Sequence, residues 1–200
     1  MTGFLIFLFL ATFFLMTKLG EIFGKRVGFY VKKENLYDVS SENCIQEITI
    51  SEFDKKILRI KKIYPLFDQD DFLDKSKKAF EMIFSAYSKG DTRTLHKLLS
   101  PRIFRAFSMA IDDRKKRGEI IEGILVRFIS SEIIDADEGN EDIFITVKFE
   151  TEQSNVLKSK DGTVLEGNAD FVENRTEIWS FSRKKSSQDS RWYLYEIKSE

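Results

Sequence analysis

The sequence predicts an α+β fold in which helices pack on an antiparallel sheet, behind an N-terminal transmembrane helix. Three observations favour it. The first 17 residues carry no charge, apolar residues from residue 68 to Gly118 recur at helical spacing, and after Gly118 they alternate with a period of two. Helices first and strands afterwards, joined by short turns, are typical of an α+β domain.

Composition limits the protein to a few classes. A chain of 200 residues that is 42% hydrophobic can bury one core, so we expect one globular domain with a short appendage. The formal charge of -1 gives no field that would attract nucleic acid, and no nucleic-acid partner is expected. Cys44 and His96 are the single residues of their types. We therefore expect neither an intramolecular disulfide, a metal site nor a cofactor.

The N-terminal segment is predicted to be a membrane anchor at residues 1–20. The run from Phe4 to Met16 is apolar except for Thr12. As a helix, residues 3–19 would be about 25 Å long, which is the short end of the range for spanning a bilayer. A cleaved signal peptide would show basic residues before the apolar run and a small-x-small site after it, and neither is present. A signal peptide and a buried helix remain the alternatives.

Cations follow the apolar run and predict its orientation. Residues 1–67 carry ten Lys and Arg against seven Asp and Glu, so the basic bias lies beside the hydrophobic end. The positive-inside rule then places the N-terminus outside and the C-terminal domain in the cytoplasm. We expect a single-pass protein of a bacterial-type inner membrane, or of the matrix side of the mitochondrial inner membrane in a eukaryote. The expected membrane contacts in this part are Phe4, Phe7, Phe9, Phe13, Phe14, Lys18, Lys25 and Arg26.

Residues 21–67 are predicted to form a basic and polar juxtamembrane linker that contains one short amphipathic helix. This helix is expected at 54–64, with Asp54 as its N-cap and Pro65 ending it. Its cations could rest on anionic lipid headgroups, its apolar side could enter a partner's groove, or the helix could pack one side on its own domain. These three alternatives stay open. The expected membrane-contacting cations are Lys55, Lys56, Arg59, Lys61 and Lys62.

Residues 68–200 are predicted to form the α+β domain, and its helices are marked by their ends. The first begins at the acidic residues after Asp68 and ends at Gly90, and a short second one is capped by Asp91 or Thr92. The third opens with Ser100-Pro101 and ends at Gly118. We expect its last basic residues, 114–117, to be solvent-exposed and to complement the helix dipole. The apolar stripes are Phe72, Phe80, Ile83, Phe84 and Tyr87, then Ile103, Phe104, Phe107 and Ile111.

The strands are predicted from alternation and turn residues. A β-rich run covers 120–134 and a turn covers 138–140. The next strand, Asp142 to Glu150, places Ile143, Ile145, Val147 and Phe149 on one face. A second turn at 160–162 leads to a strand at 172–183, and a closing strand covers 191–198.

Four blocks of this sequence, in order, resemble one known family. They are FLDKSKKAFEMIFSAYSKGD, TLHKLLSPRIFRAFSMAIDDR, ITVKFETEQ and WSFSRKKSSQDSRWYLYEI. They are similar to the Tim44-like domain, found in the membrane-tether subunit of the mitochondrial import motor and in bacterial relatives, over about residues 70–198. Lys75-Ser76 stands where the family usually has Gly-Ala, and Asp189-Ser190-Arg191 where it usually has Asp-Pro-Asn.

The resemblance implies more than the patterns do. It implies a cone-like fold related to the nuclear transport factor two-like superfamily, with a curved sheet and a large apolar pocket between the sheet and the helices. We expect Phe80, Phe84, Phe107 and Trp179 to line that pocket. The resemblance also implies contact with the lipid bilayer, anionic lipids in particular, and with membrane or translocated proteins.

Three hypotheses for function follow. The first is a non-catalytic membrane-anchored adaptor or scaffold in protein translocation or inner-membrane protein assembly, and the second is a module that binds a lipid or small apolar ligand. The third, an enzyme, finds little support, since the chain shows no phosphate loop, metal-ligand spacing or nucleophile elbow. Asp112 and Asp113 would point about 100° apart on a helix and form no working pair. Glu177 faces into or away from the pocket depending on the register of its strand.

Overall fold

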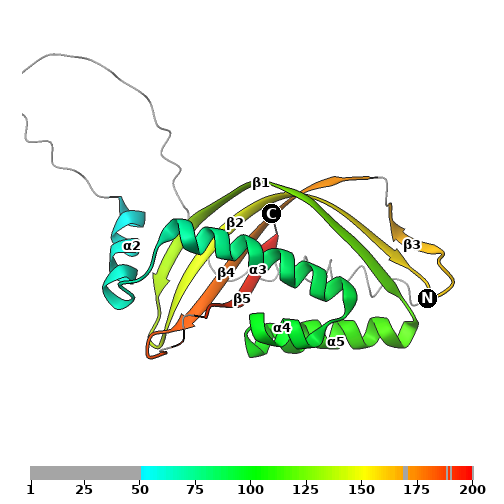
Figure 1. Ribbon diagram of the computed structural model, residues 1–200, viewed down its shortest axis with the longest axis horizontal. Coiled ribbons are helices and arrows are strands. Elements are labelled where there is room, and N and C mark those ends of the chain that lie inside the picture. Colours follow the sequence, from blue (N-terminus) through cyan, green and yellow to red (C-terminus); the bar gives the residue numbers. More distant parts are fainter. Residues whose placement is uncertain (1–50, 169–170, 188, 190, 200) are drawn as a thin grey trace, which may run out of the picture.

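The computed structural model describes residues 51–199 except 169, 170, 188 and 190. Within this part four helices precede five strands, which confirms the α+β fold with helices packed on a curved antiparallel sheet (Figure 1). None of the helices described there is long and apolar enough to span a bilayer. The anchor predicted at residues 1–20 lies outside the described residues.

The four helices begin and end close to the residues that the sequence marks. Asp68 caps α3 by accepting a hydrogen bond from the backbone N–H of Asp71 at 2.8 Å, and Asp91, rather than Thr92, caps α4. Gly90 and Gly118 end α3 and α5 in the left-handed conformation, with φ of 68° and 69°. The helices are α2 (Glu52–Ile63), α3 (Gln69–Lys89), α4 (Thr92–Leu98) and α5 (Pro101–Arg117).

The sheet has the strand order β1-β2-β4-β5, and β3 pairs with the last residues of β2. All pairings between these strands are antiparallel. Three register shifts interrupt the pairing of β1 with β2, and such bulges bend a strand and increase its twist, so they help the sheet to curve over α3 (Figure 1). The strands are β1 (Ile120–Glu138), β2 (Asp142–Lys158), β3 (Val164–Gly167), β4 (Glu173–Lys184) and β5 (Tyr193–Ser199).

The core lies between α3 and the inner face of the sheet. The predicted inward face of β2 is confirmed, because the four alternating apolar residues from Ile143 to Phe149 are at most 1% exposed. Phe80 of α3 packs over Trp179 of β4, with ring centroids 4.4 Å apart. β2 continues beyond the predicted end at Glu150 and reaches Lys158.

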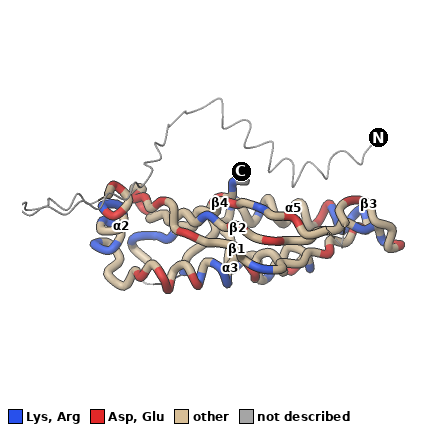
Figure 2. Tube along the Cα trace, turned by 90° about the horizontal axis from the view of Figure 1, so that it is seen from above, with Lys and Arg blue, Asp and Glu red and all other residues tan. Residues whose placement is uncertain are grey.

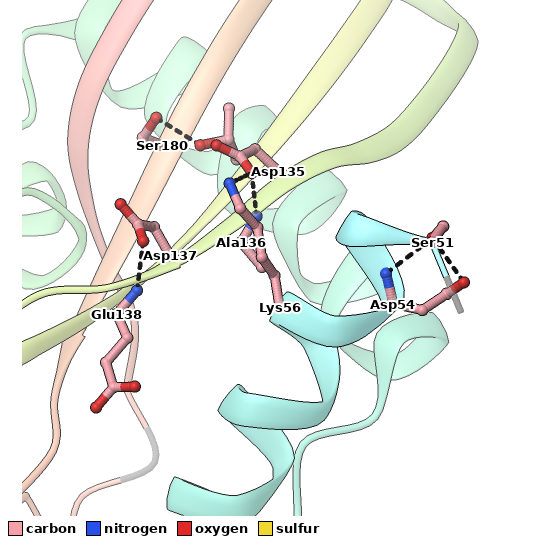
Figure 3. A network of polar contacts seen from close by, with 9 residues as sticks. Ser51, Asp54, Lys56, Asp135, Ala136, Asp137, Glu138 and Ser180 are labelled. Atoms are coloured by element: carbon pink, nitrogen blue, oxygen red, sulfur yellow. Dashed lines mark hydrogen bonds and ion pairs between the residues drawn. The ribbon is translucent and has the colours of Figure 1, made fainter. Parts of the chain in front are cut away.

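The domain is elongated, with α2 at one end and β3 at the other (Figure 2). α2 packs its apolar side on the domain, since Ile57 and Ile60 are buried in the same core as the sheet. The Lys56 ammonium also reaches the Asp135 carboxylate of β1, at 2.7 Å (Figure 3). The apolar side of this helix is therefore occupied by its own chain.

The start of α2 differs from the prediction. Asp54 is not the N-cap. Ser51 is, because its Oγ accepts from the Asp54 backbone N–H at 3.0 Å (Figure 3). The same hydroxyl donates to Asp54 Oδ2 at 2.7 Å, so the two residues stabilise the first turn together, and the helix begins at Glu52. It ends at Ile63, just before Pro65, as predicted.

Candidate functional site

The first candidate site is the outward side of α2, which we call the basic face: Lys55, Arg59, Lys61 and Lys62. These four residues are exposed, and Lys and Arg gather on this helix (Figure 2). Lys55 pairs with Glu52 at 2.6 Å. Arg59, Lys61 and Lys62 have no ion-pair partner within the part of the chain that the structure describes. The basic face therefore retains charge for an outside partner.

Two exposed leucines accompany the basic face. Leu58 is 48% exposed and Leu66, three residues beyond the end of α2, is 82% exposed. Cations with protruding aliphatic side chains are typical of surfaces that contact anionic lipid headgroups. Lys56, predicted with the membrane-contacting cations, instead pairs with Asp135 and is only partly exposed. The other predicted membrane contacts, from Phe4 to Arg26, lie outside the described residues.

The second candidate site is a cavity of about 600 Å³ between α3, α5 and the inner face of the sheet. Phe80, Phe84, Phe107 and Trp179 all border it. The cavity has the size of sites that hold small ligands in other proteins. The structure thus brings together the four side chains that the sequence analysis selected.

A polar cluster from the neighbouring strands β2 and β4 also borders the cavity. Gln153 donates through Nε2 to Glu177 Oε2 at 3.0 Å and to Thr151 Oγ1 at 2.8 Å. Burial raises the pKa of Glu177, opposed in part by this hydrogen bond and by the charge of Arg175. The register of β4 therefore turns Glu177 inward, and the pKa shift favours its neutral form.

Arg114 departs most clearly from the prediction. Its side chain was expected to be solvent-exposed with the other cations at the end of α5, but the residue is only 5% exposed and borders the cavity. Its Nη2 donates to the carbonyl oxygens of Tyr87 and Ser88 at 2.9 and 3.0 Å, which satisfies the C-terminal end of α3. Desolvation lowers the pKa of Arg114. It thus joins two helices at the cavity wall.

A sequence signal for Arg114 existed. The residue stands three positions after Ile111 and seven after Phe107, so it continues the apolar stripe of α5. Three neighbouring cations at 115–117 concealed that spacing. Arg175 and Gln153 are two further polar cavity residues that were not predicted from the sequence.

The arrangement suits binding more plainly than catalysis. One part of the cavity is aromatic and another is polar, as in sites that hold a molecule with both characters. No group of three His, Cys, Asp or Glu residues able to hold a metal ion occurs among residues 51–199 as far as they are described.

Comparison with known proteins places the chain in a family. The model of the Tim44-like domain matches residues 54–199. The "Mitochondrial import inner membrane translocase subunit TIM44-1" of Arabidopsis thaliana is 20% identical over 133 residues, which are 66% of this chain and 28% of the relative. The chain therefore spans little more than a quarter of that protein.

Two solved structures match part of the chain with TM-scores below 0.5. The intermembrane space region of the chloroplast protein ARC6 has a TM-score of 0.46 and 12% identity, over 64% of this chain and 95% of that one. A conserved protein from Planctomyces limnophilus has a TM-score of 0.35 and 15% identity, over 66% and 98% of the two chains. The family assignment depends on the domain match, which covers well over half of the sequence. The chain belongs to the Tim44-like domain family.

Proposed function

We propose that this protein is a non-catalytic membrane-anchored adaptor or scaffold in protein translocation or inner-membrane protein assembly. The observation that carries the proposal is the match of residues 54–199 to the Tim44-like domain, supported by a relative named as an import translocase subunit. Because the chain spans only 28% of that relative, the role is proposed rather than transferred. The expected partners are the bilayer and membrane or translocated proteins.

The order of features along the chain supports membrane attachment. An uncharged segment and its following cations precede α2, and α2 uses its apolar side within the domain. An anchor at residues 1–20 would hold the basic face near the membrane surface, where each cation gains about 1 kcal/mol from anionic lipids. The proposed topology keeps the N-terminus outside and the domain in the cytoplasm, or in the matrix in a eukaryote.

Truncation tests this arrangement. Removal of residues 1–33 should release the protein to the soluble fraction of lysed cells. If the truncated chain stays on membranes, the anchor is not what holds it.

The contribution of the basic face to membrane binding can then be measured as binding of the truncated chain to anionic vesicles. Lys61→Glu with Lys62→Glu should reduce residual vesicle binding, because both changes reverse charges that lack a described partner. Lys115→Glu with Lys116→Glu, on the exposed end of α5, is the matched control and should leave binding nearly unchanged. Equal losses in both pairs would show that general charge, rather than the basic face, attracts the vesicles.

A second candidate function is binding of a lipid or small apolar ligand, favoured by the cavity of about 600 Å³ and its aromatic border. Aromatic residues at helical spacing often serve only as core, so the cavity itself is the observation that favours this candidate. Native mass spectrometry of protein purified without added lipid tests it. A reproducible bound mass is expected, and a protein that is empty in every preparation would remove this candidate.

A further inference from the structure

The cavity changes character along two paired strands. On the inner face of β4, Arg175 and Glu177 are followed by the aromatic residue Trp179. On β2, Phe149 is followed by inward-facing polar residues, and the register pairs Thr151 with Arg175. The polar positions of both strands therefore lie at the same end of the cavity, and the aromatic ones lie beside them.

Two arginines that border the cavity have donors without acceptors. The residue Arg114 is 95% buried, given its 5% exposure, and its Nη1 has no hydrogen-bond partner within the described ranges. The buried Nε of Arg175 likewise has none among the described residues. Buried donors are nearly always paired in native proteins, and an oxygen acceptor would satisfy both groups.

Two of the described acidic residues that border the cavity already have cation partners. Glu173 already accepts from Arg175 Nη2, at 2.8 Å, and Asp113 pairs with Lys116 at 3.1 Å. Glu173 therefore offsets part of the charge of Arg175, whereas neither of these two carboxylates pairs with Arg114.

Two further described acids that border the cavity have raised pKa values. Burial raises the pKa of Glu177 and also that of Glu166. Both shifts weaken the repulsion that an anion would meet, and none of the described carboxylates that border the cavity forms an ion pair with Arg114.

We propose that the cavity binds a single-chain amphiphile with an anionic oxygen head, its chain against Phe80 and Trp179 and its head at Arg114 and Arg175. The inference rests on the second candidate function above and names the ligand class for it. A charged head that accepts from these guanidinium groups would gain charge-assisted hydrogen bonds that a neutral head cannot match. The aromatic end supplies the apolar contact for the chain.

The test uses two probes of equal chain length, 9,10-dibromostearate and 9,10-dibromostearyl alcohol. Bromine quenches tryptophan at close range, and Trp192→Phe leaves Trp179 as the single tryptophan of the chain. The full-length Trp192→Phe protein is held in amphipol, so that detergent does not compete. We expect saturable quenching by both probes, with the carboxylate binding at least about tenfold more tightly than the alcohol.

Arginine variants then locate the head. Arg175→Met and Arg114→Met should each lose most of the preference for the carboxylate, while Arg175→Lys should keep part of it. Arg127→Met is the matched control, because Arg127 pairs with Glu152 at 2.6 Å and does not border the cavity. If Arg114→Met does not fold, since Arg114 also joins two helices, Arg175→Met decides the question alone.

The possible outcomes test the anionic head separately from ligand binding in the cavity and from the adaptor function. Equal affinity for acid and alcohol would overturn the anionic head and leave the cavity as an apolar ligand site. An unchanged preference in Arg175→Met would overturn the assignment of the head to these arginines. Absence of quenching by either probe would overturn both the inference and the second candidate function, without touching the adaptor proposal.

Discussion

The two halves of β2 belong to one continuous strand, but the side chains on their inner faces differ in polarity. From Ile143 to Phe149 every inward residue is apolar and at most 1% exposed. From Thr151 onward the inward residues are Thr151, Gln153 and Asn155, although the first two are also nearly completely buried. The first half can be explained by stability alone. The second half places amides and a hydroxyl where apolar side chains would pack more simply, which is typical of a functional site.

Because their inner faces differ, the two halves of β2 should tolerate substitution differently. We expect the largest loss of stability in the first half. Phe149 is completely buried, with ring centroids of Phe80 and Trp179 at 5.1 and 5.9 Å. Phe149→Ala should lower the free energy of unfolding by about 3–5 kcal/mol, measured by urea denaturation. Asn155→Ala, in the second half, should cost less than about 1 kcal/mol. Similar costs for the two variants would mean that both halves serve only as core.

The next largest loss of stability is expected for Arg114 in the wall of the cavity. Arg114→Met should lower the free energy of unfolding by about 1–3 kcal/mol, because the carbonyl oxygens of Tyr87 and Ser88 at the end of α3 both lose a hydrogen bond from the buried guanidinium. Arg127→Met breaks an ion pair whose arginine is 60% exposed, so it should lower the free energy of unfolding much less in the same assay. A larger loss for Arg127 would contradict the structural role given to Arg114.

Glu177, at the polar end of the cavity, should make the stability of the protein depend on pH. Burial raises its pKa above the ordinary 4.5, so the folded protein holds this proton to higher pH than the unfolded chain does. The stability that the folded protein gains by holding this proton is complete below about pH 4.5. It is lost as the pH rises through the folded-state pKa. Glu177→Gln mimics the protonated form. The stability of the native protein relative to this variant should therefore fall as the pH rises above about 4.5, and a difference that stays constant with pH would refute the shift.

The smallest loss of stability is expected for the ion pair between α2 and β1, at the opposite end of the domain from β3. Lys56 and Asp135 are 37% and 49% exposed, so their ion pair should contribute no more than about 1 kcal/mol. Lys56→Met should therefore lower the denaturation midpoint only slightly, and the loss should shrink further in high salt. A large loss would show that α2 depends on this pair more than on Ile57 and Ile60.

Much of the fold is encoded locally, and the sequence therefore reveals it. Helix ends follow from Asp68, Gly90 and Gly118, whose side chains or backbone freedom act within one turn. Ser51 was missed as a cap because Asp54, three residues on, is itself a favourable capping residue. The confirmed inward face of β2 follows from strict alternation.

Features that depend on contacts distant in sequence were not predictable. The register of β1 is set by three bulges that appear only in its pairing with β2, and alternation alone cannot locate them. β2 was predicted to end at Glu150 because its inner face becomes polar at Thr151. Because of this change from apolar to polar residues, the polar half of the cavity was not predicted. The burial of Arg114 was not predicted because its neighbours in sequence are also cations.

The most direct test of the adaptor proposal is photo-crosslinking in intact membranes from a reactive residue placed at Lys62. A matched probe at Lys116, on the exposed end of α5, gives the background. We predict that the probe at Lys62 labels lipid or membrane-embedded translocation proteins well above that background. Equal labelling from both positions, or label found only on proteins unconnected with any membrane, would contradict the proposal.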